Sequence, residues 1–233
     1  MCASINAKVL KTVYGDIKNK NKYFKIVVDY NKIEIALDAG HGSNTFGKMS
    51  PNGRLREYAW CREQVSLIAE GLKQLGIKYY IVTPELYDVG LTTRANRVNK
   101  RAAENKKKGI STILISVHNN AAGNGTKWMP ATGWECWTTK GKTRSDLLAE
   151  CMYDAAEEML SGFEIKMRTD KSDGDRDKEE NWTILYKSNC PCILTENLFM
   201  DNKKDCEFLL SPYGKQLIAN MHVKGILNWC AKN

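Results

Sequence analysis

The feature of this sequence that most constrains its fold is a regular alternation of strand-like and helix-like segments. Short apolar runs favour strands, and the segments between them carry apolar residues at helical spacing. The strand-like runs are 33–38, 77–83, 112–117, 133–138 and 191–195. Because strands that alternate with helices usually pair in parallel, the pattern predicts an α/β fold with a mostly parallel mixed sheet flanked by helices on both faces.

Four helical patterns complete this alternation. One ends at Gly76, one runs from about 92 to 108, one follows Ser145 and one follows Ser211-Pro212. No linker rich in proline or serine divides residues 33–233, which predicts a single domain. Residues 1–32 differ, since two β-like stretches flank the polar sequence DIKNKN, and they predict a short N-terminal hairpin-like extension. The stretch TDKSDGDRDKEENW at 169–182 is almost entirely polar and predicts a surface loop.

Composition narrows the classes of protein that fit this chain. Hydrophobic residues make up 42% and charged residues 27% of it, as in ordinary globular proteins. No apolar stretch reaches the roughly 20 residues that a membrane helix needs, so no membrane insertion is expected. The N-terminus lacks the pattern of a signal peptide, which predicts synthesis in the cytoplasm. The 8 cysteines include no CxxC pair, and we expect them to be mostly reduced core residues.

The net charge of the chain indicates what kind of molecule it binds. A net charge of +8 favours an acidic partner, which could be nucleic acid, an anionic envelope polymer or a membrane surface. Most lysines are scattered, and the sequence contains neither zinc-finger spacing nor an RNA-binding motif. We therefore expect no nucleic-acid partner, and the sequence specifies no oligomeric state.

Three polar residues stand at the ends of predicted strands. His41 follows the run 33–38 in the sequence DAGHG, His118 follows ILISV, and Glu196 follows CILT. Open parallel sheets bind their ligands at the carboxyl ends of the strands. These three residues therefore predict one shared site.

Glu57 is a fourth candidate because it lies on the inward face of a predicted helix. Counting back in steps of four from Val65 gives Cys61 and then Glu57. A buried carboxylate needs a partner, which could be an arginine (Arg54 or Arg94) or a metal ion. Two imidazoles and one carboxylate form a ligand set of catalytic zinc sites, with a fourth position left for water.

Two further residues have similar chemistry but a different position. Glu63 belongs to the same predicted helix as Glu57 but points to another face. His222 lies near the apolar stripe of the last helix, and we expect it to be structural. Neither is included in the candidate site.

Six stretches of the sequence together resemble a known family. In chain order they are ALDAGHGS, REYAWCREQVSLIA, LTTRANRVN, ISVHNNAAG, GWECWTT and ILTENLFMDN. The chain resembles a zinc-dependent N-acetylmuramoyl-L-alanine amidase of the amidase-3 type, over roughly residues 33–230. The departures are modest: Cys61 stands where a polar residue is usual, and Asn197-Leu198 replace a small-residue step after the glutamate.

The resemblance implies a substrate, a cofactor and a role for each candidate. Peptidoglycan would be the partner, and a zinc-activated water would cleave the amide bond between N-acetylmuramic acid and L-alanine of the stem peptide. His41, Glu57 and His118 would bind Zn²⁺, and Glu196 would be the catalytic carboxylate.

Further expectations concern three neighbouring residues and the biological setting. We expect Asp38 to orient a zinc-bound imidazole, and Asn120 and Arg94 to contact the glycan or the stem peptide. An amidase made in the cytoplasm without a signal peptide resembles a phage or prophage endolysin, which reaches the bacterial cell wall after release through membrane pores.

Three alternatives predict different measurements. Another zinc peptidase acting on the stem peptide would release a free amino acid. A catalytically inactive wall-binding module would bind peptidoglycan without clearing it. A nucleic-acid binder would show steeply salt-dependent binding to DNA or RNA.

Overall fold

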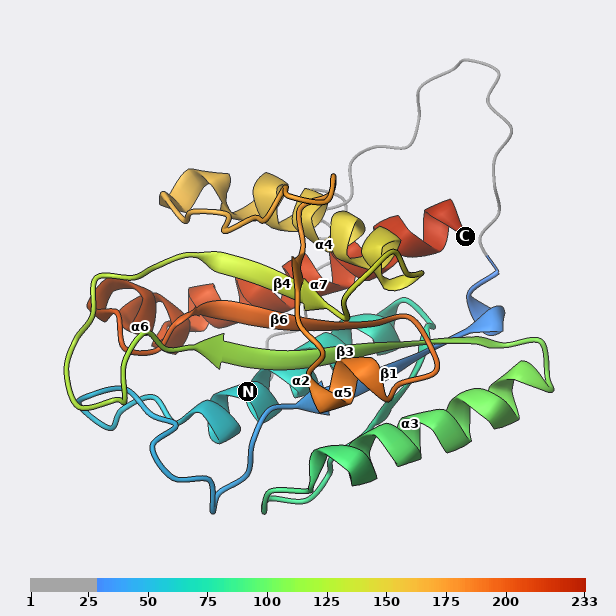
Figure 1. The fold of residues 1–233 in the computed structure, drawn as a ribbon, viewed down its shortest axis with the longest axis horizontal. Helices are drawn as coiled ribbons and strands as arrows, with labels where there is room; N and C mark the ends of the chain where they lie inside the picture. Colours follow the sequence, from blue (N-terminus) through green and yellow to red (C-terminus); the bar gives the residue numbers. More distant parts are fainter. Residues whose placement is uncertain (1–28) are drawn as a thin grey trace.

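The computed structural model describes residues 29–233, which fold around one mixed β-sheet (Figure 1). The sheet has six strands in the order β2-β1-β3-β6-β4-β5. The strands are β1 (Ile33–Ala39), β2 (Lys78–Ile81), β3 (Ser111–Asn120), β4 (Trp134–Thr138), β5 (Lys178–Glu179) and β6 (Cys192–Phe199). β6 pairs in parallel with β3 and antiparallel with β4, so the predicted mostly parallel mixed sheet is confirmed.

Helices cover both faces of the sheet, as predicted. They are α2 (Glu57–Gln74), α3 (Leu91–Lys106), α4 (Ser145–Leu160), α5 (Thr183–Tyr186), α6 (Lys203–Leu210) and α7 (Pro212–Lys232). A large apolar core joins one face of the sheet, including Ile35 and Leu37 of β1, to α2, α4 and α7. A smaller core on the other face joins Ala36 to α3 and α5. Within residues 29–233, no helix is long and apolar enough to cross a membrane.

The long predicted elements are present with shifted ends, and three short ones were not predicted. α5, α6 and β5 are too short to show a period in the sequence. α6 nevertheless begins with a typical cap, in which the Asn202 side chain accepts a hydrogen bond from the backbone N–H of Asp205. The seven cysteines within the described residues are free, and all except Cys190 are buried, as expected.

The predicted N-terminal hairpin lies almost entirely in residues 1–28, outside the described residues. At the end of this segment, Tyr30–Lys32 form a short 3₁₀ turn, η1. The turn is capped by Asp29, whose side chain accepts a hydrogen bond from the backbone N–H of Asn31. The main domain therefore enters its first strand directly from this turn.

The polar stretch 169–182 matches the predicted surface loop only in part. Residues 170–174 are exposed, but Lys178–Glu179 pair with β4, and Asp177 is 1% exposed. Thr138 Oγ1 donates a 2.5 Å hydrogen bond to Asp177 Oδ2. Burial raises the pKa of Asp177 to about 8, and the neighbouring Asp175 carboxylate adds to the shift. The edge of the sheet thus contains a buried carboxyl group with a raised pKa, which the polar sequence did not indicate.

We expect the Asp177→Asn variant to be less sensitive to pH than the wild-type protein. The folded-state pKa of Asp177, about 8, exceeds the ordinary value of 3.8. Between these two pH values the folded chain binds more protons than the unfolded chain, so the stability of the wild type falls as pH rises. Melting temperatures measured at pH 5 and pH 8 should show the variant gaining on the wild type at pH 8 by at least about 2–4 °C, the shift that 1 kcal/mol produces at this size, because the pH interval between the two pKa values corresponds to more than about 1 kcal/mol.

Asp170→Asn is the control for this measurement. Asp170 is exposed, and its hydrogen bonds with Ser172 lower its pKa, so it titrates below pH 5. Its substitution should have the same effect at pH 5 and pH 8. An equal effect of Asp177→Asn at both pH values would show that Asp177 does not titrate between them.

Candidate functional site

The candidate site lies at the carboxyl ends of the central parallel strands β1, β3 and β6. His41 follows β1, His118 lies near the end of β3, and Glu196 of β6 pairs directly with His118 in the strand register. Glu57 is the first residue of α2, and its carboxylate contacts both imidazoles. The structure therefore brings together the four residues that the sequence placed in one site.

The Glu57 carboxylate stands between the two imidazoles. Its Oε1 lies 3.1 Å from His118 Nδ1, and its Oε2 lies 3.4 Å from His41 Nε2. One ligand atom from each of the three side chains lies within 4.8 Å of the others. This arrangement suits a single cation held by two imidazole nitrogens and one carboxylate oxygen.

Unpartnered buried oxygens indicate that a cation fits at this site. Among residues 29–233, Oε2 of the candidate ligand Glu57 has no hydrogen-bond partner, and neither has Oε2 of the adjacent Glu196. An unpartnered carboxylate oxygen is costly in a buried place, and a cation would offset this cost. Because the donor set is also that of catalytic zinc sites, the residues present fit a zinc ion.

The backbone at residues 40 and 41 allows the two imidazoles to approach. A Cβ atom at Gly40 would lie 2.5 Å from the His118 ring, so this position accommodates only glycine. His41 has a φ of 58°, a left-handed conformation that is unfavourable for residues other than glycine. The His41 and His118 rings meet edge to face, with centroids 5.1 Å apart. Gly40 and the left-handed backbone of His41 thus allow the two candidate ligands to pack closely.

Burial and neighbouring charges separate the pKa values of the site. Burial lowers the pKa of His41 to about 4, which keeps its imidazole neutral and able to bind a metal. Burial alone would raise the pKa of Glu57, but the hydrogen bond and charge of His118 hold it below its usual value. Burial raises the pKa of Glu196 to about 8 against the opposing effect of His118. Glu57 is therefore suited to be a ligand and Glu196 to exchange a proton near neutral pH.

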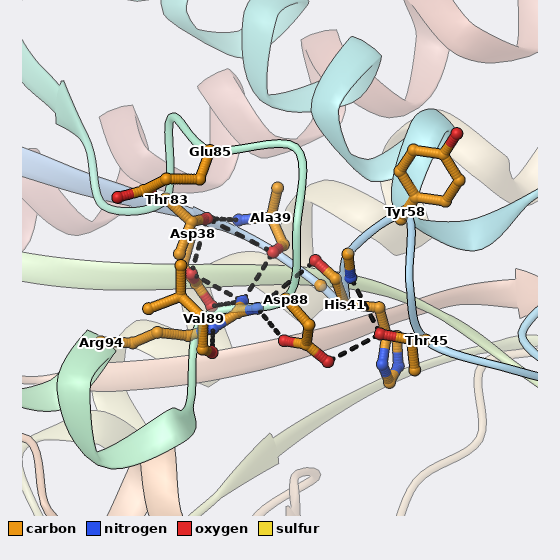
Figure 2. A network of polar contacts seen from close by, with 12 residues as sticks. Asp38, Ala39, His41, Thr45, Tyr58, Thr83, Glu85, Asp88, Val89 and Arg94 are labelled. Atoms are coloured by element: carbon orange, nitrogen blue, oxygen red, sulfur yellow. Dashed lines mark hydrogen bonds and ion pairs between the residues drawn. The ribbon is translucent and has the colours of Figure 1, made fainter.

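Arg94 lies in a buried network behind His41 (Figure 2). Its side chain is 1% exposed. Its guanidinium donates hydrogen bonds to Asp38 Oδ1 (3.0 Å), Ala39 O (2.7 Å), His41 O (3.3 Å) and Asp88 Oδ1 (2.8 Å). This corrects the prediction that Arg94 contacts the glycan or the stem peptide, because its donors are directed at the protein itself. Arg94 instead holds the loop that carries His41.

Asp38 supports the site indirectly. Its carboxylate accepts hydrogen bonds from Arg94, Thr83 Oγ1 and Ser116 Oγ, and no imidazole of the described chain contacts it. The predicted direct orientation of an imidazole by Asp38 is therefore replaced by an indirect one. Asp38 holds Arg94, which donates to the backbone carbonyl of His41.

A second guanidinium contacts the same carbonyl. Arg62 of α2 donates from Nη2 to His41 O at 3.1 Å and to Glu85 O at 2.7 Å. The sequence pattern gave no indication of this role for Arg62, because the contact joins a helix to a loop 21 residues earlier. The left-handed conformation of His41 is thus held by arginines from two different helices.

Other candidate residues occupy distinct places. Asn120, at the end of β3, is partly exposed and donates a 2.7 Å hydrogen bond to Glu135 Oε1, so its contact with substrate stays a prediction. Glu63 forms an ion pair with a lysine of α7 on the outer side of α2. His222 is buried and bonded to Thr195 Oγ1, which is consistent with the expected structural role.

Glu135 lies near the site but was not among the residues predicted from the sequence. It pairs directly with Glu196 across β4 and β6, and it is 2% exposed. The available signal was a charged residue inside the strand-like run GWECWT, since a charge in a buried strand needs partners.

Comparisons with known proteins identify the family. Residues 35–228 match the family described as N-acetylmuramoyl-L-alanine amidase, Amidase_3. The endolysin of Bacillus phage SPP1 is 27% identical over 198 residues, which cover 82% of this chain and 63% of the endolysin. The N-acetylmuramoyl-L-alanine amidase CwlM of Bacillus licheniformis is 26% identical over 200 residues, which cover 83% of this chain and 67% of CwlM. This chain thus spans less than two thirds of the endolysin.

A solved structure shows the same fold. The crystal structure of an N-acetylmuramoyl-L-alanine amidase from Clostridium difficile 630 has a TM-score of 0.69 at 24% identity, and the match covers 84% of this chain and 96% of that one. The family match extends over most of the sequence and includes all four residues of the candidate site. This chain therefore belongs to the Amidase_3 family of N-acetylmuramoyl-L-alanine amidases.

Proposed function

We propose that this chain hydrolyses the amide bond between N-acetylmuramic acid and L-alanine of the peptidoglycan stem peptide, with zinc as its cofactor. The observation that carries the proposal is the set of His41, Glu57 and His118 ligand atoms within 4.8 Å of one another, with His118 paired in register with Glu196. The family match supports the choice of reaction.

The three ligand side chains would hold the zinc ion. His41 would offer a neutral ring nitrogen. Glu57 would supply a negative charge, because the pKa of its buried carboxyl group is below the usual value. When bound at such a site, zinc lowers the pKa of a water to about 7 and polarises a carbonyl oxygen. The proton transfers of the reaction are carried out by a side chain of the protein.

Glu196 is the group that moves the proton. In its basic form it accepts a proton from the water whose oxygen attacks the lactyl carbonyl carbon. It then gives this proton to the L-alanine nitrogen as the C–N bond breaks, and the second proton of the water passes from the new lactyl carboxyl group to the released amine, so that the products are a lactyl carboxylate and an ammonium terminus. A pKa of about 8 suits a carboxyl group that is alternately base and acid near neutral pH.

The bacterial cell wall is the proposed place of action, with release of the phage type. The similarity to the SPP1 endolysin supports this setting. The net charge of +8 would attract the chain to anionic envelope polymers.

Digestion of purified peptidoglycan tests the proposal. The released fragments should carry a new L-alanine amino terminus, which mass spectrometry identifies. Chelation should stop the reaction, and added Zn²⁺ should restore it. A free amino acid as the product would instead indicate a carboxypeptidase, and binding without new termini would indicate an inactive wall-binding module.

A further inference from the structure

A second polar cluster lies directly beside Glu196, and no step of the proposed reaction uses it. We call Asn120, Glu135, Arg168 and Lys178 the Glu135 cluster. Glu135 and Glu196 face each other in the antiparallel register of β4 and β6. Side chains directly opposite on such a pair have Cβ atoms about 4.5–5.5 Å apart. The cluster therefore begins one side chain away from the catalytic carboxylate.

Glu135 is buried and fully paired. Its Oε1 accepts hydrogen bonds from Asn120 Nδ2 at 2.7 Å and from Trp137 Nε1 at 3.0 Å. Its Oε2 accepts from Arg168 Nε at 2.6 Å and from Lys178 Nζ at 2.7 Å. Burial would raise the pKa of Glu135, but the hydrogen bonds from Lys178 and Arg168 lower it. An ionised Glu135 with two cations leaves the cluster with a net positive charge.

Several contacts fix the position of Arg168. Its backbone N–H donates to Trp134 O at 2.9 Å, and its carbonyl accepts from Tyr153 Oη at 2.9 Å. Its guanidinium lies over the Phe199 ring, 5.0 Å from the centroid. Gly133 leaves space for it, because a Cβ there would lie 2.9 Å from Arg168 Cγ. These contacts fix both the backbone and the guanidinium of Arg168.

The outer part of the guanidinium remains available. Glu135 uses Nε, whereas neither Nη1 nor Nη2 has a hydrogen-bond partner in residues 29–233. The side chain is 31% exposed, so solvent and ligands reach it. A guanidinium that presents its two terminal amino groups matches the geometry of a carboxylate, which it binds with two parallel hydrogen bonds.

We propose that Arg168 binds a free carboxylate of the stem peptide while the amide bond to be cleaved lies at Glu196. The inference rests on the proposed function. An extended peptide advances about 3.3–3.6 Å per residue, so a group one or two residues beyond the cleaved bond would reach a neighbour of Glu196. The enzyme would then prefer stems with a carboxylate at this place over stems with a carboxamide. Glu135 is the positioning residue that aims the guanidinium.

Two muropeptides that differ only in this group, carboxylate or carboxamide, test the inference. The wild type should cleave the carboxylate form with a kcat/KM about 10–100-fold higher, as expected for charged hydrogen bonds. Arg168→Gln should lower kcat/KM for the carboxylate form to the value for the carboxamide form, mainly by raising KM. Arg168→Lys, which keeps the charge but not the paired donors, should restore only part of the preference.

Lys106→Gln is the matched control for charge. Lys106 is exposed at the end of α3, and its substitution removes one positive charge without altering the ratio between the substrates. Equal cleavage of both muropeptides by the wild type would overturn the inference, as would equal losses on both in Arg168→Gln at normal zinc content. In either case the proposed function would stand. Failure of the wild type to cleave either muropeptide would instead overturn the proposed function.

Discussion

The Glu196→Gln variant should cleave muropeptides about 10²–10⁴-fold more slowly than the wild type, the usual loss when an acid–base group is removed. Glutamine keeps the size of the side chain but cannot accept and return the proton. Because three other residues are the proposed zinc ligands, the zinc content should stay near one ion per chain. The melting temperature near pH 7 should change little, because burial raises the pKa of Glu196 to about 8 and glutamine is neutral like the protonated glutamate.

Zinc content, melting temperature and turnover should be measured on one preparation of this variant. A structural role for Glu196 predicts the opposite pattern, with lower stability and near-normal activity per folded molecule. Near-normal turnover at full zinc content would remove Glu196 from the mechanism.

The second large effect is expected at Glu57. Glu57→Gln should weaken zinc binding by more than about 100-fold, since loss of a ligand should exceed the 10–100-fold cost of losing a group that only orients one. Activity should fall with zinc content. Chelation should lower the melting temperature of the wild type, because zinc binds the folded chain, but should have little effect on the variant.

Glu63→Gln is the control on the same helix. Glu63 pairs with Lys215 near the surface, so its substitution should change stability by only a fraction of a kcal/mol and leave zinc binding intact. Loss of zinc in Glu63→Gln with normal zinc in Glu57→Gln would show that Glu63 is the ligand.

The proximity of the four candidate residues could be predicted because it depends on two regular periods. Parallel strands place their carboxyl ends at one edge of the sheet, which brings His41 and His118 near Glu196. The helical period then directs Glu57 inward, on the face that Val65 shares. No knowledge of distant side-chain contacts was needed for these four positions.

The role of Arg94 could not be predicted in the same way. At helical spacing Arg94 lies one turn before the apolar Val98, and both are buried in α3, so the sequence did contain a signal of burial. It gave no indication of which acceptors the guanidinium would find, since Asp38 lies 56 residues away. The spacing of residues along a helix therefore does not distinguish a buried structural arginine from one that binds substrate.

The Glu135 cluster was missed for a related reason. Its members come from β3, β4 and β5 and from the segment that precedes β5. β5 consists of two polar residues, and it is a strand only because β4 offers a free edge. No apolar period marks such an element, so the cations that surround Glu135 become neighbours only in the folded sheet.

The conformation of His41 has a consequence for when the metal can bind. Its carbonyl is held by Arg62 and Arg94, so the ligand acquires its orientation only after β1, α2 and α3 have assembled. An unfolded or partly folded chain lacks this orientation and offers only separated, weak ligands. Metal uptake should therefore be a late event that follows folding, and it should act as a check on assembly. A chain with a misplaced helix would lack the oriented His41 that the proposed zinc site needs, and we expect it to take up no zinc.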